Sequence, residues 1–358
     1  MNEALSRADA FCNRFGLGLP ILLAPMAGAC PPSSSIAVME AGGMGGCGAL
    51  LMEPGEIEQW AAAVRTRVDR PFQINLWIPA PPPVRNRQQE TRIREFLRRW
   101  GPPVPEDAGD KTPPDFGRQC EAILRIAPAA VSSIMGLYPA DVVNELKARR
   151  IFWLATATTL SEAKAAEAAG ADVIIAQGME AGGHRGAFDP AKAQDELVGL
   201  FALIPAIADA VRIPVVAAGG IADGRGVAAA LMLGASAAML GTAFLRCSET
   251  GISQAWADAL VNTGPEQTIV SRAFSGKPGR SIATNYVRAA VAPEAPEPAP
   301  YPVQRGLTAA MRADAEKRGD IQRMQAWAGQ SAARARAESA SVLTKRFWAE
   351  AKALLSGR

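Results

Sequence analysis

Short apolar runs alternate with alanine-rich segments of helical pattern from residue 20 to about residue 245. The runs lack the polar alternation of half-exposed strands, so we expect buried strands of a parallel sheet that is covered by helices. Helix-like segments follow most of the runs, for example Leu160–Ala169 and Gly224–Leu233. The candidate strands are Ile21–Ala24, Cys47–Leu51, Phe72–Leu76, Val131–Met135, Phe152–Ala155, Val173–Ala176, Val215–Ala218 and Ala237–Leu240.

Eight strand-then-helix units in this length predict an α/β fold, namely a (β/α)8 TIM-type barrel. The rival is a doubly wound sheet, which would usually carry a glycine-rich dinucleotide turn after its first strand, and residues 24–28 (Ala-Pro-Met-Ala-Gly) are not such a turn. We expect the barrel over residues 1–262 and a mostly helical C-terminal extension over residues 263–358 that packs on it. The last helix of the extension is expected from about Ser331 to Leu355.

A proline-rich segment near residues 79–114 interrupts the alternation. Either a functional lid or a solvent-exposed insertion would fit this position. Because proline runs favour extended surface chain, we favour an insertion for its outer part.

Composition narrows the class of protein. The chain has 358 residues, 49% of them apolar, and a net charge of +3 with a pI near 8.6, which is too mildly basic to indicate a nucleic-acid partner. The N-terminus lacks the order of a signal peptide, and glycines break the apolar stretch Val227–Leu245, so we expect a soluble, cytoplasmic protein without a membrane partner. The five cysteines are scattered and form no CxxC pair, and a single histidine is too few for a metal site.

Glycine-rich turns follow the last two predicted strands. Gly219-Gly220 comes after the seventh strand and Gly241-Thr242 after the eighth. Glycines at these positions let backbone N–H groups approach an anion, and barrel enzymes often bind phosphate there, so we expect a phosphate site. The alternative is that these glycines merely turn the chain tightly.

His184 lies in a glycine-rich stretch after the sixth predicted strand, flanked by Gly182 and Gly183. Barrel enzymes carry their chemistry at the carboxyl ends of strands, and imidazole exchanges protons near neutral pH, so we expect a catalytic or ligand-contacting role. A lone histidine can also be a surface or core residue. Asn75 and Gln177 stand at strand ends, where an amide could bind a flavin edge or cap the next helix.

Taken together, these residues resemble the nitronate monooxygenase family, formerly called 2-nitropropane dioxygenases. The stretches Phe274–Arg280 and Trp327–Gln330 resemble the tail motifs of that family. The matching barrel stretches are Pro20–Gly28 (PILLAPMAG), Ala41–Gly46 (AGGMGG), Phe72–Leu76 (FQINL), Ala176–Gly186 (AQGMEAGGHRG), Pro214–Gly224 (PVVAAGGIADG) and Gly241–Leu245 (GTAFL).

The resemblance implies a non-covalent FMN cofactor and His184 as the catalytic base. The family usually has glutamine where this chain has Met239. The FMN contacts implied are Met26, Asn75, Gln177, Gly182, Gly220 and the stretch Met239, Leu240, Gly241 and Thr242.

The implied reaction is the oxidation of an alkyl nitronate, or a nitroalkane, by O2 to a carbonyl compound and nitrite. The flavin supplies the redox chemistry, and the barrel supplies position and electrostatics. A homodimer is a candidate assembly.

Two other functions stay open at this stage. The first is an FMN barrel that uses NAD(P)H, either an enoyl-thioester reductase or an NADH:quinone reductase. The second is a non-catalytic barrel that binds a phosphate ligand. Flavin bleaching by NADH without oxygen would indicate the first, and a colourless protein that takes up no FMN would indicate the second.

Overall fold

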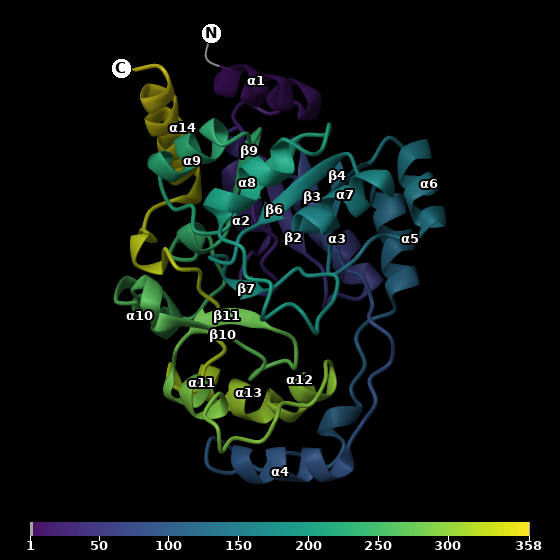
Figure 1. Ribbon diagram of the computed structural model, residues 1–358, viewed down its shortest axis with the longest axis vertical. Coiled ribbons are helices and arrows are strands. Elements are labelled where there is room, and N and C mark those ends of the chain that lie inside the picture. The colour runs from purple at the N-terminus through teal and green to yellow at the C-terminus, as the bar shows by residue number, and fades with distance from the viewer. Residues whose placement is uncertain (1–2, 358) are drawn as a thin grey trace.

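The computed structural model describes residues 3–357, and its centre is an eight-stranded parallel sheet that curves into a barrel (Figure 1). The strand order is β1-β9-β8-β6-β5-β4-β3-β2, and a parallel bridge between Leu22 and Met44 joins the two edge strands. The predicted TIM-type barrel is therefore confirmed. Its strands are β1 (Ile21–Leu23), β2 (Gly45–Gly48), β3 (Phe72–Trp77), β4 (Ala130–Ile134), β5 (Phe152–Ala157), β6 (Val173–Gln177), β8 (Val215–Ala218) and β9 (Ala237–Leu240).

Helices cover the outside of the barrel because alternate residues of each strand carry apolar side chains outward. Trp153 and Ile174 are fully buried in this outer layer, and Leu22 and Leu154 are buried inside the barrel. The covering helices are α2 (Pro32–Glu40), α3 (Pro54–Arg65), α5 (Phe116–Ile126), α6 (Ala140–Ala148), α7 (Leu160–Ala168), α8 (Leu200–Ala208) and α9 (Gly224–Met232), and α10 (Gln254–Val261) follows the last barrel strand.

The second strand lies earlier in the chain than predicted, at Gly45–Gly48 instead of Cys47–Leu51. A β-carbon on Gly46 would lie 2.3 Å from the Leu23 carbonyl oxygen, so only glycine can pass β1 at this distance. The strand is therefore made of residues with low strand propensity, which is why the apolar pattern misplaced it.

Helix α1 (Glu3–Phe15) closes the amino-terminal end of the barrel. Phe11 and Phe15 are buried in one cluster with Leu22 and Leu154, and the rings of Phe15 and Phe152 lie 4.7 Å apart between centroids. In Figure 1 this helix lies at the end of the molecule opposite to the sheet of the C-terminal extension.

The proline-rich segment is exposed and irregular up to residue 86, and residues 102–106 and 111–113 are also mostly exposed and irregular. Between these stretches the chain is not extended, because α4 (Arg87–Leu97) is a helix that packs on the C-terminal extension (Figure 1). Ile93 and Leu97 stand four residues apart on one face of this helix and are buried against Phe274 and Tyr286.

The C-terminal extension is mainly helical but also contributes two strands to a three-stranded antiparallel sheet. Its strands are β10 (Thr268–Ser271) and β11 (Gly279–Ile282), and β11 also pairs with β7 (Gly183–His184), which belongs to the loop after β6. The extension is thus joined to the barrel through the loop that carries the histidine. Its helices are α11 (Asn285–Ala290), α12 (Val303–Leu307), α13 (Ala309–Arg318) and α14 (Ala340–Leu355).

The last helix begins at Ala340 and not near Ser331. The Ser339 side chain accepts the first-turn N–H of Ser341, and residues 332–334 form only a single 3-10 turn. Serine at this position favours a helix start, since its hydroxyl accepts a first-turn N–H that has no partner within the helix. From there α14 runs beside α9 (Figure 1).

Gly306 provides a test of the contact between α12 and the proline-rich segment. A β-carbon on Gly306 would lie 1.8 Å from the Ala108 carbonyl oxygen, whereas one on Gly55 in α3 would meet nothing within 4 Å. We expect Gly306→Ala to lower the free energy of unfolding by about 3 kcal/mol, the upper range for overpacking. Gly55→Ala should change it little. Urea denaturation of both variants measures this, and equal midpoints would contradict the close contact.

Candidate active site

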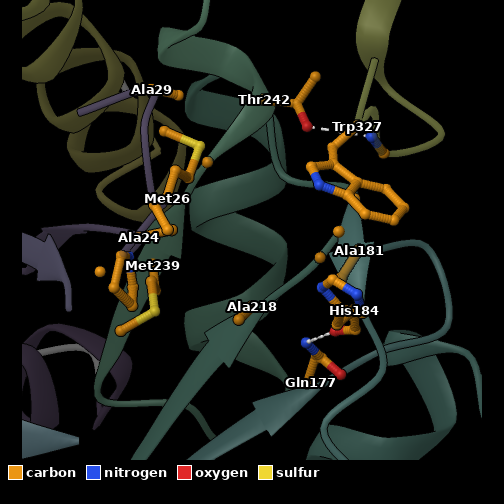
Figure 2. A pocket seen from close by; sticks show the side chains of 18 of the residues that line it. Ala24, Met26, Ala29, Gln177, Ala181, His184, Ala218, Met239, Thr242 and Trp327 are labelled. Carbon is orange, nitrogen blue, oxygen red and sulfur yellow. Dashed lines mark hydrogen bonds between the residues drawn. The ribbon is translucent and has the colours of Figure 1, made fainter. Parts of the chain in front are cut away.

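A cavity of about 280 Å³ opens at the carboxyl ends of the barrel strands. Figure 2 shows Met26 and Met239 on one side of it and Gln177, His184 and Thr242 on the other. The barrel therefore brings together residues that are up to 216 positions apart (Met26 to Thr242). The residues singled out from the sequence that line the cavity are Met26, Asn75, Gln177, Gly182, His184, Gly219, Gly220, Met239, Gly241 and Thr242.

Leu240 is the one sequence-predicted residue that does not line the cavity. Its side chain is 1% exposed and packs with Leu231 and Phe244 in the layer between strand and helices. Successive residues of a strand face opposite sides, so Met239 faces inward and Leu240 outward. The Leu240 carbonyl oxygen accepts a hydrogen bond from the Ala24 N–H at 2.9 Å.

The two glycine turns leave backbone donors without partners. Within residues 3–357, the N–H groups of Gly220, Gly241 and Thr242 donate no hydrogen bond. Gly219 and Gly220 have φ angles of +120° and +67°, which are unfavourable for other residues. The Ser331 hydroxyl donates to the Gly220 carbonyl, and the Thr242 Oγ1 accepts the Gly329 N–H at 3.0 Å. These turns offer N–H donors to an anion, and hydrogen bonds to Ser331 and Gly329 of the extension hold them in place.

The loop before His184 passes close to the extension. A β-carbon on Gly182 would lie 2.5 Å from the Gly329 backbone nitrogen. Gln177, at the end of β6, holds this loop through two hydrogen bonds. Its Nε2 donates to the His184 carbonyl at 3.1 Å, and its Oε1 accepts the Gly186 N–H at 2.7 Å. Gln177 therefore does not cap a helix but holds the histidine loop.

Asn75 is buried at the end of β3 and also caps no helix. Its Nδ2 donates to the Ser132 Oγ at 3.0 Å, and its Oδ1 accepts no hydrogen bond from the described residues. An acceptor is thus available to a ligand at this side of the cavity.

Glu180 and Arg185, on either side of the Gly182-Gly183 pair, form no ion pair with each other in the described structure. The Glu180 carboxylate accepts the Leu200 N–H at the start of α8, at 2.8 Å, and the Arg185 Nη1 donates to the Gly178 carbonyl at 2.8 Å. Both side chains therefore stabilise the loop through backbone groups.

The imidazole of His184 lies between two tryptophan rings and a serine hydroxyl. Its ring centroid is 4.6 Å from that of Trp77 and 4.7 Å from that of Trp327, and its Nε2 lies 2.7 Å from the Ser275 Oγ. Trp77 ends β3, and the other two residues come from the extension. The ring is held on several sides and has little freedom to turn.

Burial and two nearby cations lower the pKa of His184 to about 3. Removal from water is the larger cause, and the positive charges of Arg305 and Lys277 add to it. No carboxylate within residues 3–357 forms a salt bridge with either cation, although Lys277 is only 8% exposed. His184 is therefore neutral at physiological pH, in surroundings that favour a negative charge on a bound ligand.

Several cavity residues were not found from the sequence. Trp77, Arg305, Gln325 and Trp327 line the cavity, and Ser275 holds the histidine. Two of these lie in the tail stretches that resemble the family motifs, and that resemblance is the signal that could have found them. Nothing in the strand pattern indicates that the extension folds back over the carboxyl ends of the barrel.

No cluster of three or more metal-ligating side chains occurs among residues 3–357. In the same part of the chain no helix has the length and apolar character needed to cross a membrane.

A parallel eight-stranded barrel with a cavity at the carboxyl ends of its strands is the arrangement of a TIM-barrel enzyme. The sequence profile described as "Nitronate monooxygenase" matches residues 13–347. The chain therefore belongs to the nitronate monooxygenase family, which is a family of oxidoreductases.

Individual relatives agree with this assignment. The chain is 40% identical to a nitronate monooxygenase of Paraburkholderia phytofirmans over 94% of this chain and 93% of the relative. It is 37% identical to a nitronate monooxygenase of Pseudomonas aeruginosa over 94% and 97% of the two chains. The solved structure of a nitroalkane oxidase from Streptomyces ansochromogenes matches with a TM-score of 0.88 and 36% identity, over 97% of this chain and 99% of that one.

The five cysteines are all buried and unpaired. Burial raises the pKa of the Cys247 thiol to about 12 and acts in the same direction on the others. We therefore expect no alkylation by iodoacetamide at pH 8 in the native protein, since only about one thiol in 10⁴ is ionised at a pKa four units above the pH. Unfolding in urea should make all five react. Mass spectrometry counts the labels, and rapid native labelling of Cys247 would contradict the burial of its thiol and the raised pKa.

Proposed function

We propose that this protein is an FMN-dependent enzyme that oxidises alkyl nitronates with O2 to carbonyl compounds and nitrite. The observation that carries the proposal is a neutral histidine beside two cations without counter-charges, in a cavity bordered by glycine turns with free donors. A nitronate is an anion, and the two cations and the free N–H donors favour the binding of an anion.

The donor set of the cavity suits FMN. The unpaired N–H groups of Gly220, Gly241 and Thr242 can bind a phosphate, and the free Oδ1 of Asn75 can accept from a flavin N–H. Met26 and Met239 offer apolar contact to a ring system. When bound, FMN supplies an electron acceptor next to the substrate, which protein side chains do not provide.

The charges near His184 support this substrate class. Arg305, which lines the cavity, and Lys277 behind the ring would attract the nitro oxygens toward the side of the cavity that holds the imidazole. In the overall reaction two nitronates consume one O2: each carbon–nitrogen bond breaks, each carbon gains one of the two oxygen atoms, and two nitrite ions leave. Trp77 and Trp327 pack against His184 and would cover part of the ring.

Preformed nitronates should be better substrates than neutral nitroalkanes. A nitroalkane must first give its α-proton to a base, and burial makes His184 a weak base because it lowers its pKa to about 3. Arg305 and Lys277 partly offset this, because they stabilise the negative charge that develops on the nitro group. For a nitronate the proton has already gone, and the same cations act only in binding.

Gly220 tests the phosphate site. An aspartate there would put a negative charge against the phosphate, and Asp and Asn both tolerate a φ of +67° better than most residues. We expect Gly220→Asp to give a folded protein without flavin and Gly220→Asn, which has the same shape and no charge, to keep substantially more. Absorbance at 450 nm and circular dichroism measure flavin content and folding. A Gly220→Asp protein with a full complement of FMN would refute the placement.

His184→Asn tests the base. With nitroalkane substrates we expect kcat/KM to fall by about 10²–10⁴-fold, the usual contribution of general base catalysis. With preformed nitronates the loss should be only a few-fold, because no proton is removed. FMN content must be equal in the two proteins compared.

Equal losses on both substrates would mean that His184 binds the anion and is not a base, and no loss on either would remove it from the site. As a control for the alternative function, the wild-type enzyme is mixed with NADH without oxygen. The flavin should remain oxidised, and rapid bleaching would favour an NAD(P)H-dependent reductase.

A further inference from the structure

Ser275 connects the histidine of the barrel to the backbone of the C-terminal extension. It lies between β10 and β11 and is fully buried. Its Oγ is 2.7 Å from the His184 Nε2, 3.3 Å from the Lys277 backbone nitrogen and 3.3 Å from the Lys277 carbonyl oxygen. The imidazole therefore has a neutral hydroxyl partner where many functional histidines have a carboxylate.

The hydrogens around Ser275 can be assigned from these three contacts. A serine hydroxyl has one hydrogen to donate and two lone pairs that accept. The Lys277 N–H can only donate, and the Lys277 carbonyl can only accept. If the hydroxyl gave its hydrogen to the His184 Nε2, the buried Lys277 carbonyl would lose its hydrogen bond, since no other group in residues 3–357 donates to it.

The other assignment satisfies every group. The His184 Nε2 carries a hydrogen and donates it to the Ser275 Oγ, which also accepts the Lys277 N–H and donates its own hydrogen to the Lys277 carbonyl. Buried polar groups are nearly always paired, so this arrangement is favoured over one that leaves a carbonyl alone.

The second nitrogen of the ring, Nδ1, then has a free lone pair. Within residues 3–357 no group forms a hydrogen bond with Nδ1, and His184 lines the cavity. Trp77 and Trp327 pack against the ring, so a flip that would exchange the two nitrogens is hindered. The charged and titratable groups nearest to the ring, Lys277 and Arg305, are cations and do not pull a second proton onto it.

We propose that Ser275 is a positioning residue that holds His184 in the tautomer with hydrogen on Nε2 and a lone pair on Nδ1. Only the catalytic consequence rests on the proposed function, since the tautomer follows from the hydrogen bonds alone.

The consequence concerns the proton of a nitroalkane. The α-carbon–hydrogen bond breaks, its electron pair stays on the substrate as the nitronate, and the proton goes to Nδ1. The imidazolium that forms still donates from Nε2 to Ser275, so the proton transfer needs no rearrangement of the hydrogen bonds. With the opposite tautomer, Nδ1 would already carry hydrogen and could not accept the proton.

His184 is the one histidine among the 358 residues, so its ring nitrogens give the only imidazole signals in a spectrum. We would label histidine with 15N and record the NMR spectrum of the FMN-loaded protein between pH 5 and pH 8. The expected result is a protonated Nε2 and an unprotonated Nδ1 over this whole range. A protonated Nδ1, or rapid averaging of the two tautomers in the wild-type protein, would overturn the proposal.

Variants of Ser275 connect the tautomer to catalysis. Ser275→Ala should give mixed tautomers and lower kcat/KM for nitroalkanes by roughly 10- to 100-fold, the loss that is usual when a metal-binding histidine loses the group that orients it. The effect on nitronates should be small. Ser275→Thr retains the hydroxyl and should restore both the spectrum and the rate, and Ser275→Cys is the substitute of similar size if threonine does not fit the buried site.

The outcomes separate this proposal from the proposed function. If His184→Asn loses activity with nitroalkanes while Ser275→Ala keeps the wild-type spectrum and rate, Ser275 has no positioning role and the proposed function stands. If His184→Asn loses no activity, the histidine is not the base, whatever tautomer the spectrum shows. If neither Ser275→Ala nor Ser275→Thr folds, the wild-type spectrum and the Ser275→Cys variant test the positioning role.

Discussion

The close approach of two backbone segments at the barrel rim determines how the cavity is built. A β-carbon on Gly182 would lie 2.5 Å from the Gly329 nitrogen, and one on Gly329 would lie 2.8 Å from the Glu180 carbonyl oxygen. Two hydrogen bonds fix the contact, from the Gln330 N–H to the Glu180 carbonyl at 3.0 Å and from the Gly329 N–H to the Thr242 hydroxyl at 3.0 Å. Trp327 reaches His184 because the extension is held at this point.

The electrostatics of the cavity differ from those of a serine–histidine–aspartate triad, where a carboxylate supports a strong base. Here Ser275 is neutral, and Lys277 and Arg305 carry positive charge close to the ring. Keeping such cations away from water costs free energy unless an anion pairs with them. Burial accordingly lowers the pKa of Lys277, and an anionic ligand would relieve this cost. The site is built more to hold a negative charge than to create one.

The barrel and most of its rim could be predicted because strand burial imposes a pattern on the sequence. That pattern indicates the residues at strand ends, such as Asn75 and Gln177, and it fails at β2, where glycines replace the usual strand residues. The family resemblance implies FMN contacts along the whole stretch Met239–Thr242 and does not show which side chains of β9 face the cavity. Leu240 is therefore included in the predicted site although its side chain points outward. Arg305 could not be placed, because it lies outside the stretches that resemble the family and a pattern within one segment does not show where a separate segment folds back.

The aromatic residues of α1 close one end of the barrel. Phe11 and Phe15 fill the amino-terminal end of the barrel together with Leu22 and Leu154, so this end is closed by packed side chains. The barrel is consequently not a channel. Molecules cannot pass through it from end to end, so both entry to the cavity and departure from it take place on the carboxyl side of the strands.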